Sequence, residues 1–170
     1  MDSSQAKAVA EFLIADLQNE IQTTERVLAA APSNHLDYRP DNKSKTGLGL
    51  LRHITLEDEW LLTSIADGVF TPAPDDSDAC GIMTSADAAA RYKQRVPAAL
   101  DRLRALSGEQ LAQVIDFMGL FQAPRVNMLG LALKHSVHHR GQLSTYLRAM
   151  GGSVPSIYGP TADTQVAATA

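Results

Sequence analysis

Two histidines, His135 and His139, stand four residues apart in a stretch with helical periodicity, residues 127–150. A helix turns by about 100° per residue, so both imidazoles lie on one apolar face, one above the other. Imidazoles in this arrangement can bind the same metal ion if another element supplies further ligands. Taken alone, the pair is more typical of core histidines with hydrogen-bond partners, because such buried imidazoles are ordinary in proteins.

The apolar face that carries the two histidines is a stripe about 120° wide. Lys134 and Arg140 fall well outside this stripe, whereas His138 lies on its edge. From that edge, His138 is better placed to pack against a neighbouring histidine, or to support one, than to bind a metal directly. The stripe consists of Met128, Leu131, Ala132, His135, His139, Gln142, Leu143 and Tyr146.

Three earlier segments also repeat apolar residues with helical spacing, namely residues 3–31, 46–67 and 84–107. In the last of these segments, Thr84 and Asp87 resemble a capping box, and Pro97 predicts a kink or an interruption. The helix around the histidine pair is expected to begin with Asn127 as its N-cap. These four segments must position any chemistry that the chain performs.

The remaining segments show no comparable periodicity. Residues 32–45 and 68–83 are predicted to be loops. Residues 109–126 are predicted to begin as a short helical turn and then to be irregular, because a single strand would have no sheet to join. The sequence gives residues 165–170, QVAATA, no reason to be ordered. Four amphipathic helices without a credible strand pattern predict an all-α fold, a four-helix bundle, in a single domain over residues 1–170.

The second helical segment carries His53 on the same face as Glu57, whereas Asp58 and Glu59 turn away from that face. Bundle cores build metal sites from side chains on facing helices, so His53 is the natural third ligand beside the histidine pair. Three neutral imidazoles leave a coordination position of a divalent ion open, which is typical of a catalytic site. The face through His53 also carries Gly49, Leu50, Trp60 and Ser64.

The composition excludes several classes of partner. The net charge of −4 and the lack of a lysine or arginine cluster argue against nucleic acid. No segment reaches the roughly 20 apolar residues of a membrane-spanning helix, and the N-terminus lacks a signal-peptide pattern, so we expect a cytoplasmic protein without membrane contact. The single cysteine, Cys80, cannot form an internal disulfide and is interpreted as incidental.

Two stretches together give a resemblance to a known family. LGLLRHITLEDEWLL around His53 and HSVHHRGQLSTYLRAMGGSVPSIYGP near the C-terminus are similar to the DinB/YfiT-like family, the bacterial damage-inducible family of metalloenzymes. The resemblance implies a bundle with up-down-down-up helix order, usually a homodimer. It also implies a divalent metal bound by His53, His135 and His139. Imidazole suits several ions, of which zinc and nickel are the foremost expectation here and iron a further one.

Other side chains on the two histidine faces have expected roles. Glu57 and Gln142 each lie about one helical turn from a ligand, so each could accept a hydrogen bond from its imidazole. Glu57 could instead face the open position and act as a general base. An ordinary carboxylate at the edge of the core is an equal alternative for Glu57. Trp60 and Tyr146 are interpreted as core residues, and Tyr158 as a turn anchor rather than a cover over the site.

The family includes S-transferases that use low-molecular-weight thiols such as bacillithiol, and mycothiol-dependent isomerases. The resemblance therefore favours an enzyme in which the metal activates a small thiol that attacks a small-molecule substrate. A metal-dependent hydrolase is the nearest alternative, because hydroxide can occupy the same position as thiolate. A non-catalytic bundle, such as a metal carrier, a sensor or an interaction module, is the third. An open coordination position distinguishes an enzyme from a carrier.

Overall fold

The computed structural model describes residues 1–164, and the expectation for residues 165–170 lies outside this range. The long elements are the helices α1 (Ser3–Ala29), α2 (Gly47–Asp67), α3 (Ser85–Arg104) and α5 (Arg125–Ala149). The short elements are the 3-10 turn η1 (Asp78–Cys80), the helix α4 (Gly108–Ala112) and the strands β1 (Val114–Phe117) and β2 (Phe121–Pro124). The mostly helical fold is confirmed, but the all-α expectation missed a small two-stranded sheet.

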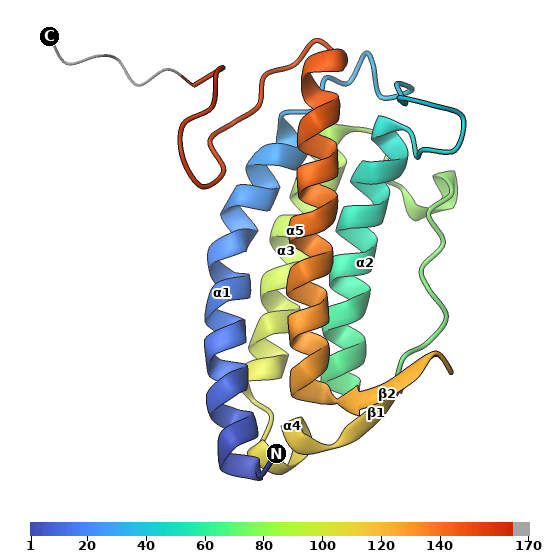
Figure 1. Ribbon diagram of the computed structural model, residues 1–170. Coiled ribbons are helices and arrows are strands. Elements are labelled where there is room, and N and C mark those ends of the chain that lie inside the picture. The colour runs from blue at the N-terminus through green and yellow to red at the C-terminus, as the bar shows by residue number, and fades with distance from the viewer. Residues whose placement is uncertain (165–170) are drawn as a thin grey trace, which may run out of the picture.

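The four long helices lie side by side, with α1 and α5 running upward in Figure 1 and α2 and α3 running downward. Helix α1 packs against α3 and α5, and α2 packs against the same two helices. Helix α5 therefore has one side toward α2 and another toward α1. The first of these sides carries the histidine pair, and the second carries a buried arginine that is described below.

The long helices bury the apolar faces that their periodicity predicts. On α1 the buried residues Ala6, Ala10, Ile14, Leu17 and Ile21 follow helical spacing, and the buried residues of α2 include Leu50, Leu51, Ile54, Leu61, Leu62 and Ile65. Full burial of a leucine or isoleucine side chain contributes roughly 1.5–3 kcal/mol relative to exposure. These contacts hold α2 against its neighbours and so fix the position of His53.

Capping residues mark the ends of α2 and the start of α3. The Thr46 side chain caps α2 by accepting from a backbone N–H, and Gly68 ends the helix with a φ of 79°, in the left-handed region that favours glycine. The predicted capping box of Thr84 and Asp87 is confirmed. The interruption expected as one possibility at Pro97 is absent, and α3 continues through this residue. Buried residues on both sides of Pro97 hold the helix against α1 and α2.

The prediction for residues 109–126 was wrong for all but the first residues. The short helical turn expected at the start of the segment is present as α4, but the rest forms an antiparallel hairpin in which Ile115 pairs with Ala123. Met118 and Gly119 have φ values of 53° and 76°, and the Asp116 carboxylate accepts from the Gly119 N–H, so the chain reverses within the three residues that separate the strands. A strand in this segment therefore finds its partner in the same segment.

The start of α5 also differs from the prediction. The helix begins at Arg125, with Pro124 in the N-cap position and no side-chain cap, rather than after Asn127. The reason is the preceding hairpin, whose last residue leads directly into the helix. The Arg125 N–H donates to the carbonyl of Gln113 at 3.0 Å, and this bond satisfies a donor that would otherwise need a cap.

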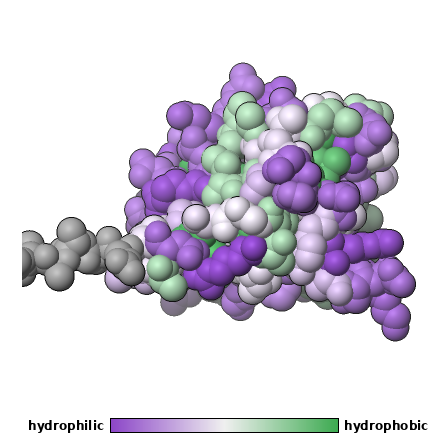
Figure 2. Space-filling view, turned by 90° about the horizontal axis from the view of Figure 1, so that it is seen from above, coloured by the Kyte–Doolittle hydropathy of each residue, from purple (hydrophilic) through white to green (hydrophobic). Residues whose placement is uncertain are grey.

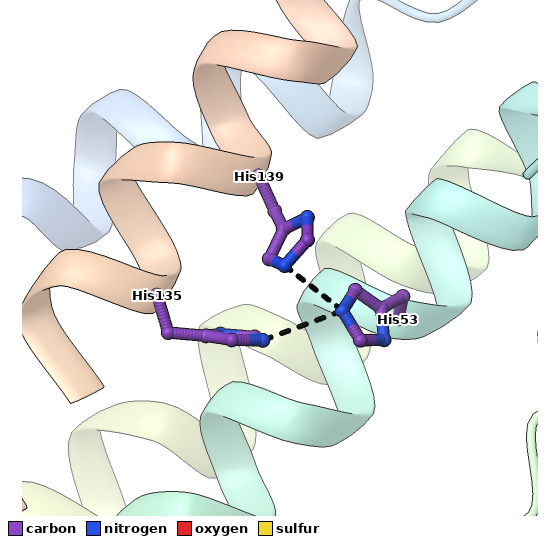
Figure 3. A group of neighbouring side chains, drawn as sticks. All are labelled: His53, His135 and His139. Atoms are coloured by element: carbon purple, nitrogen blue, oxygen red, sulfur yellow. Dashed lines mark hydrogen bonds between the residues drawn. The ribbon is translucent and has the colours of Figure 1, made fainter. Parts of the chain in front are cut away.

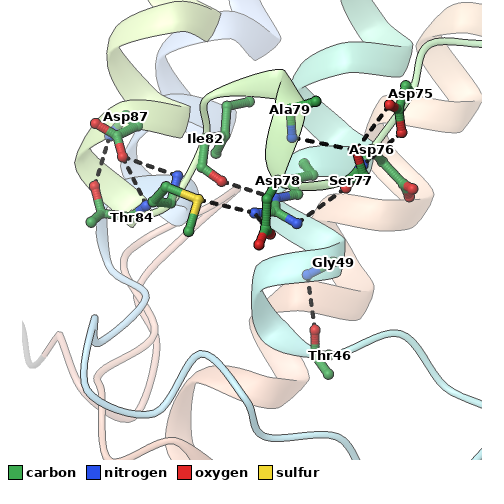
Figure 4. A network of polar contacts seen from close by, with 12 residues as sticks. Thr46, Gly49, Asp75, Asp76, Ser77, Asp78, Ala79, Ile82, Thr84 and Asp87 are labelled. Atoms are coloured by element: carbon green, nitrogen blue, oxygen red, sulfur yellow. Dashed lines mark hydrogen bonds and ion pairs between the residues drawn. The ribbon is translucent and has the colours of Figure 1, made fainter.

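The loop between α2 and α3 is fastened to α2 by Arg52, the residue before His53. The buried Arg52 guanidinium donates to the carbonyl oxygens of Ile82 at 2.8 Å and Asp76 at 3.2 Å, and to Asp78 Oδ1 at 2.7 Å. Figure 4 labels these three acceptor residues of the loop. A buried guanidinium with several oxygen acceptors gives a specific geometry to the segment that it binds. The loop is thereby held beside the helix that carries His53.

The chain after α5 returns to α1. Arg140 donates to the Glu20 carboxylate and to the Tyr158 hydroxyl, and that hydroxyl donates to Glu20 Oε1 at 3.0 Å. Arg140, which lies outside the apolar stripe, is therefore only 1% exposed. These contacts agree with the anchor role expected for Tyr158. Figure 2 looks onto this end of the molecule, where apolar surface runs between strongly polar margins.

Among the helices formed by residues 1–164, none combines the length and the apolar character needed to cross a membrane.

Candidate metal centre

The structure brings His53 of α2 together with His135 and His139 of α5 (Figure 3). Nε2 of His53 lies 3.1 Å from Nε2 of His139 and 3.3 Å from Nε2 of His135. Each of the three side chains is partly buried, and one nitrogen from each lies within 4.8 Å of the others. These three residues form a group that could hold a metal ion.

The spacing of the three nitrogens fits a small divalent cation. Ligand nitrogens about 2.0–2.1 Å from a tetrahedral ion lie about 3.4 Å from one another. The two separations from His53 Nε2, 3.1 and 3.3 Å, are close to this value. Only small side-chain movements would be needed for the three imidazoles to bind one ion.

The outward nitrogens of the α5 histidines have oxygen partners. Nδ1 of His135 lies 3.0 Å from Asp58 Oδ1, and Nδ1 of His139 lies 3.0 Å from Gln142 Oε1. An oxygen acceptor at Nδ1 requires the hydrogen to be there, so the neutral imidazole presents a lone pair at Nε2. Lone pairs directed at one another are unfavourable without a hydrogen or a cation between them. The donor set therefore suits a cation.

The environment keeps two of the histidines neutral at pH 7. Burial, followed by the nearby His139 and His135, lowers the pKa of His53 to about 4. Burial also lowers the pKa of His139. A metal ion needs the unprotonated imidazole, so protons compete less with the metal here than at an exposed histidine.

The lowered pKa of His53 predicts a loss of stability in acid for the metal-free protein. Below pH 6.5 the unfolded chain protonates this imidazole, whereas the folded chain does so only near pH 4, so the unfolded state binds more protons in between. Stability contributed by neutral His53 is complete above pH 6.5 and declines as the pH falls toward 4. Between pH 7 and 5, the loss is expected to be about 1 kcal/mol after allowance for partial exposure.

Urea unfolding of metal-free wild type and His53→Gln at pH 7 and pH 5 tests this expectation. The variant should lose less stability than wild type over this interval, because glutamine does not titrate. An equal loss in the two proteins would contradict the assignment of a low pKa to His53.

Glu57 lies beside the histidines without bonding to one of them. Its Oε1 is 4.0 Å from Nδ1 of His53, which is beyond a hydrogen bond. The carboxyl is half-buried, and burial raises its pKa. A carboxylate with a raised pKa accepts a proton more readily than an exposed one, so this environment suits a general base.

Asp58, which was predicted to turn away, is the site residue that the sequence analysis missed. It is 3% exposed and bonds to His135. The error came from giving α2 a single inner face, whereas α2 packs on both α3 and α5. The signal was present, because position 58 continues the helical spacing of the buried residues Leu51, Ile54, Leu61 and Ile65.

The other residues singled out in the sequence lie around the site or away from it. His138 is exposed, and its ring packs against that of His139 with the centroids 4.7 Å apart. Tyr146 is buried, whereas Trp60 is half-buried and packs on Phe70. Cys80 lies in the η1 turn and is a free thiol.

The fold and the site together define a mostly helical protein with a candidate three-histidine metal centre between two of its helices. The model of the DinB family matches residues 5–166, and the chain belongs to that family. It is 29% identical over 143 residues to the uncharacterized protein YrdA of Bacillus subtilis strain 168, with 83% of each chain covered. It is 28% identical over 123 residues to the uncharacterized protein YjoA of the same strain, covering 69% of this chain and 75% of YjoA.

Two solved structures have a similar fold. A DinB-like protein from Bacillus cereus ATCC 10987 superposes with a TM-score of 0.73 at 21% identity, covering 87% of this chain and 97% of that one. The structure of YjoA from Bacillus subtilis, described as a DinB-like protein, gives a TM-score of 0.65 at 21% identity, covering 86% and 98%. At these identities the likeness concerns the fold.

Proposed function

We propose that this protein is a metal-dependent enzyme in which His53, His135 and His139 bind one divalent ion, zinc or nickel foremost, within a four-helix bundle. The reaction that we propose is transfer of a low-molecular-weight thiol to a small electrophilic substrate. The observation that carries the proposal is the set of three facing Nε2 atoms. Among residues 1–164, the group that could hold the ion has three members and no fourth protein ligand.

An open coordination position separates an enzyme from a metal carrier, whose site would close with a further protein ligand. When bound, a divalent ion with three neutral ligands keeps its full charge and favours an anionic partner, thiolate or hydroxide, at that position. The donor set thus supports chemistry on an external nucleophile. Cys80 is not a member of the three-residue group that could hold the ion, so the sulfur is proposed to come from a separate small molecule.

Glu57 is proposed as the general base. Its half-buried carboxylate lies next to His53, and its raised pKa lets it take the proton of a small thiol and return that proton to the leaving group. Gln142 is proposed to hold His139 in the correct tautomer through its side-chain oxygen, 3.0 Å from Nδ1.

Two further expectations stay predictions. The resemblance implies a homodimer, and the sequence favours a cytoplasmic protein. The proposed partner of the site is a small molecule rather than nucleic acid or a membrane.

A thiol-conjugation assay tests the reaction. Untagged protein loaded with zinc or with nickel is mixed with a bimane-type electrophile and a panel of small thiols. Wild type is expected to accelerate conjugation, and His53→Ala is expected to lose the acceleration because a ligand is removed. Glu57→Gln should retain metal but lose about 10²–10⁴-fold in rate, the usual contribution of a general base.

His138→Ala is the matched control, because this exposed histidine adjoins the centre and is not among the three ligands. It should react like wild type. If no thiol is conjugated faster than with metal-free protein, while ester or amide substrates are cleaved without thiol, the hydrolase alternative replaces the transferase.

A further inference from the structure

Behind the histidine centre, a chain of polar side chains enters the core between α2, α3 and α5. Asp58 of α2 bonds to His135 Nδ1 through Oδ1 at 3.0 Å and accepts at Oδ2 from the Tyr92 hydroxyl at 3.1 Å. The Tyr92 oxygen lies 3.5 Å from the Ser136 hydroxyl. Asp58, Tyr92 and Ser136 are all buried, with at most 3% of each residue exposed.

Burial of the Asp58 side chain would cost free energy if the carboxylate had no hydrogen-bond partners. Removing a carboxylate from water costs several kcal/mol unless its oxygens receive good hydrogen bonds. Each oxygen of Asp58 has one such partner, His135 on one side and Tyr92 on the other. A leucine would continue the apolar face of α2 at this position, so the acid is explained by its partners rather than by packing.

Tyr92 is suited to hold Asp58 in place. Burial, followed by the charge of Asp58, raises the pKa of the Tyr92 phenol well above its usual value. The phenol therefore remains a hydrogen-bond donor at neutral pH. Because Tyr92 comes from α3, the third helix of the core contributes to the geometry of a centre whose ligands lie on α2 and α5.

A small cavity adjoins this chain on the side away from the histidines. Its volume is about 10 Å³, the space that the centre of one water molecule needs. Glu20, Asp58, Tyr92 and Ser136 contribute polar groups to its otherwise apolar wall. The polar chain thus leads from His135 toward Glu20, the partner of Arg140.

We propose that Asp58 and Tyr92 are positioning residues for His135. Asp58 holds the imidazole as the Nδ1–H tautomer, with Nε2 toward the other two histidines, and Tyr92 fixes the carboxylate in that orientation. The inference rests on the proposed metal-binding function for its consequence, but not for the tautomer itself. His135 thus has a carboxylate as its partner, whereas His139 has only the neutral amide of Gln142.

Three variants separate the charge of Asp58 from its hydrogen bonds. Asp58→Asn keeps an oxygen for His135 and a polar group for Tyr92 but loses the charge. Asp58→Leu removes both, and Tyr92→Phe leaves the charge while removing the bond that orients it. Glu59→Gln is the control, because Glu59 is the next residue on α2 but pairs with Arg91 and Arg95 instead of a histidine.

The first measurement is the ¹⁵N NMR spectrum of the histidines in metal-free protein at pH 7.5. His135 is expected to be the Nδ1–H tautomer in wild type, and its Nε2–H form should become populated in Asp58→Leu. The second measurement is zinc affinity by competition with a chelator. Asp58→Leu should weaken binding by about 10–100-fold, the usual effect of losing such a partner, with smaller losses for Asp58→Asn and Tyr92→Phe. Glu59→Gln should match wild type.

The two readouts distinguish this inference from the proposed function. Unchanged tautomer and affinity in Asp58→Leu, or, if that variant fails to fold, in both Asp58→Asn and Tyr92→Phe, would overturn the positioning role. If wild type binds no zinc, the metal function fails, whereas the metal-free NMR spectra still decide whether Asp58 sets the tautomer of His135.

Discussion

Replacing His139 with alanine is expected to remove bound metal from the purified protein. The substitution deletes one of three nitrogens that face a common point. The two that remain, Nε2 of His53 and Nε2 of His135, are 3.3 Å apart. Loss of a ligand should exceed the roughly 10–100-fold loss of affinity that follows removal of a ligand's hydrogen-bond partner. Untagged protein should therefore lose its metal during dialysis, as measured by elemental analysis.

The fold offers a matched control for this experiment. His138→Ala removes an imidazole from the next position on α5, where the side chain is exposed and packs against the His139 ring. This variant should keep one ion per chain. Equal metal content in wild type and His139→Ala, at matched purity and without a tag, would show that the three histidines are not the binding site.

The three histidines could be predicted from the sequence because each lies on a helical face with its own periodicity. His135 and His139 share a face through local geometry alone, and His53 follows once two helices are paired. Helix bounds were also predictable where side chains determine them, as with the Thr46 cap and Gly68 at the two ends of α2.

The features that were missed depend on contacts between distant segments. Asp58 is a site residue because α2 has two buried neighbours, and its Tyr92 partner lies on α3, 34 residues away. Periodicity within one helix does not reveal how many neighbours that helix has. The hairpin was missed for a related reason, since the pairing of Ile115 with Ala123 requires the reversal at Met118 and Gly119.

Arg140 is the clearest example of such a distant contact. It belongs to the same HHRGQ stretch as His139, but it points to α1 instead of α2 and contacts Glu20, Thr24 and Tyr158. Its guanidinium also lies 5.2 Å from the centre of the Tyr158 ring. Arg140 thereby joins α5, α1 and the segment after α5.

Replacing Arg140 with alanine is expected to destabilise the protein by about 3 kcal/mol, because removal of one partner leaves the other charge of a mostly buried pair unsatisfied. Urea unfolding measures this loss. Hydrogen exchange at the Val154 amide, which donates to Asp163 at 2.8 Å, should speed up as the segment after α5, residues 150–164, is released from α1.

Arg148→Ala is the control for the Arg140 variant. Arg148 also binds the segment after α5, through Asp163, but its side chain is 56% exposed. An exposed ion pair contributes about 0–1 kcal/mol, so this control should change stability little. The double variant Arg140→Met with Glu20→Leu removes both charges of the buried pair and should recover much of the lost stability, since the penalty comes from the unpaired carboxylate. If Arg140→Ala and Arg148→Ala were equally stable, the buried pair would not be what fixes the end of the chain against α1.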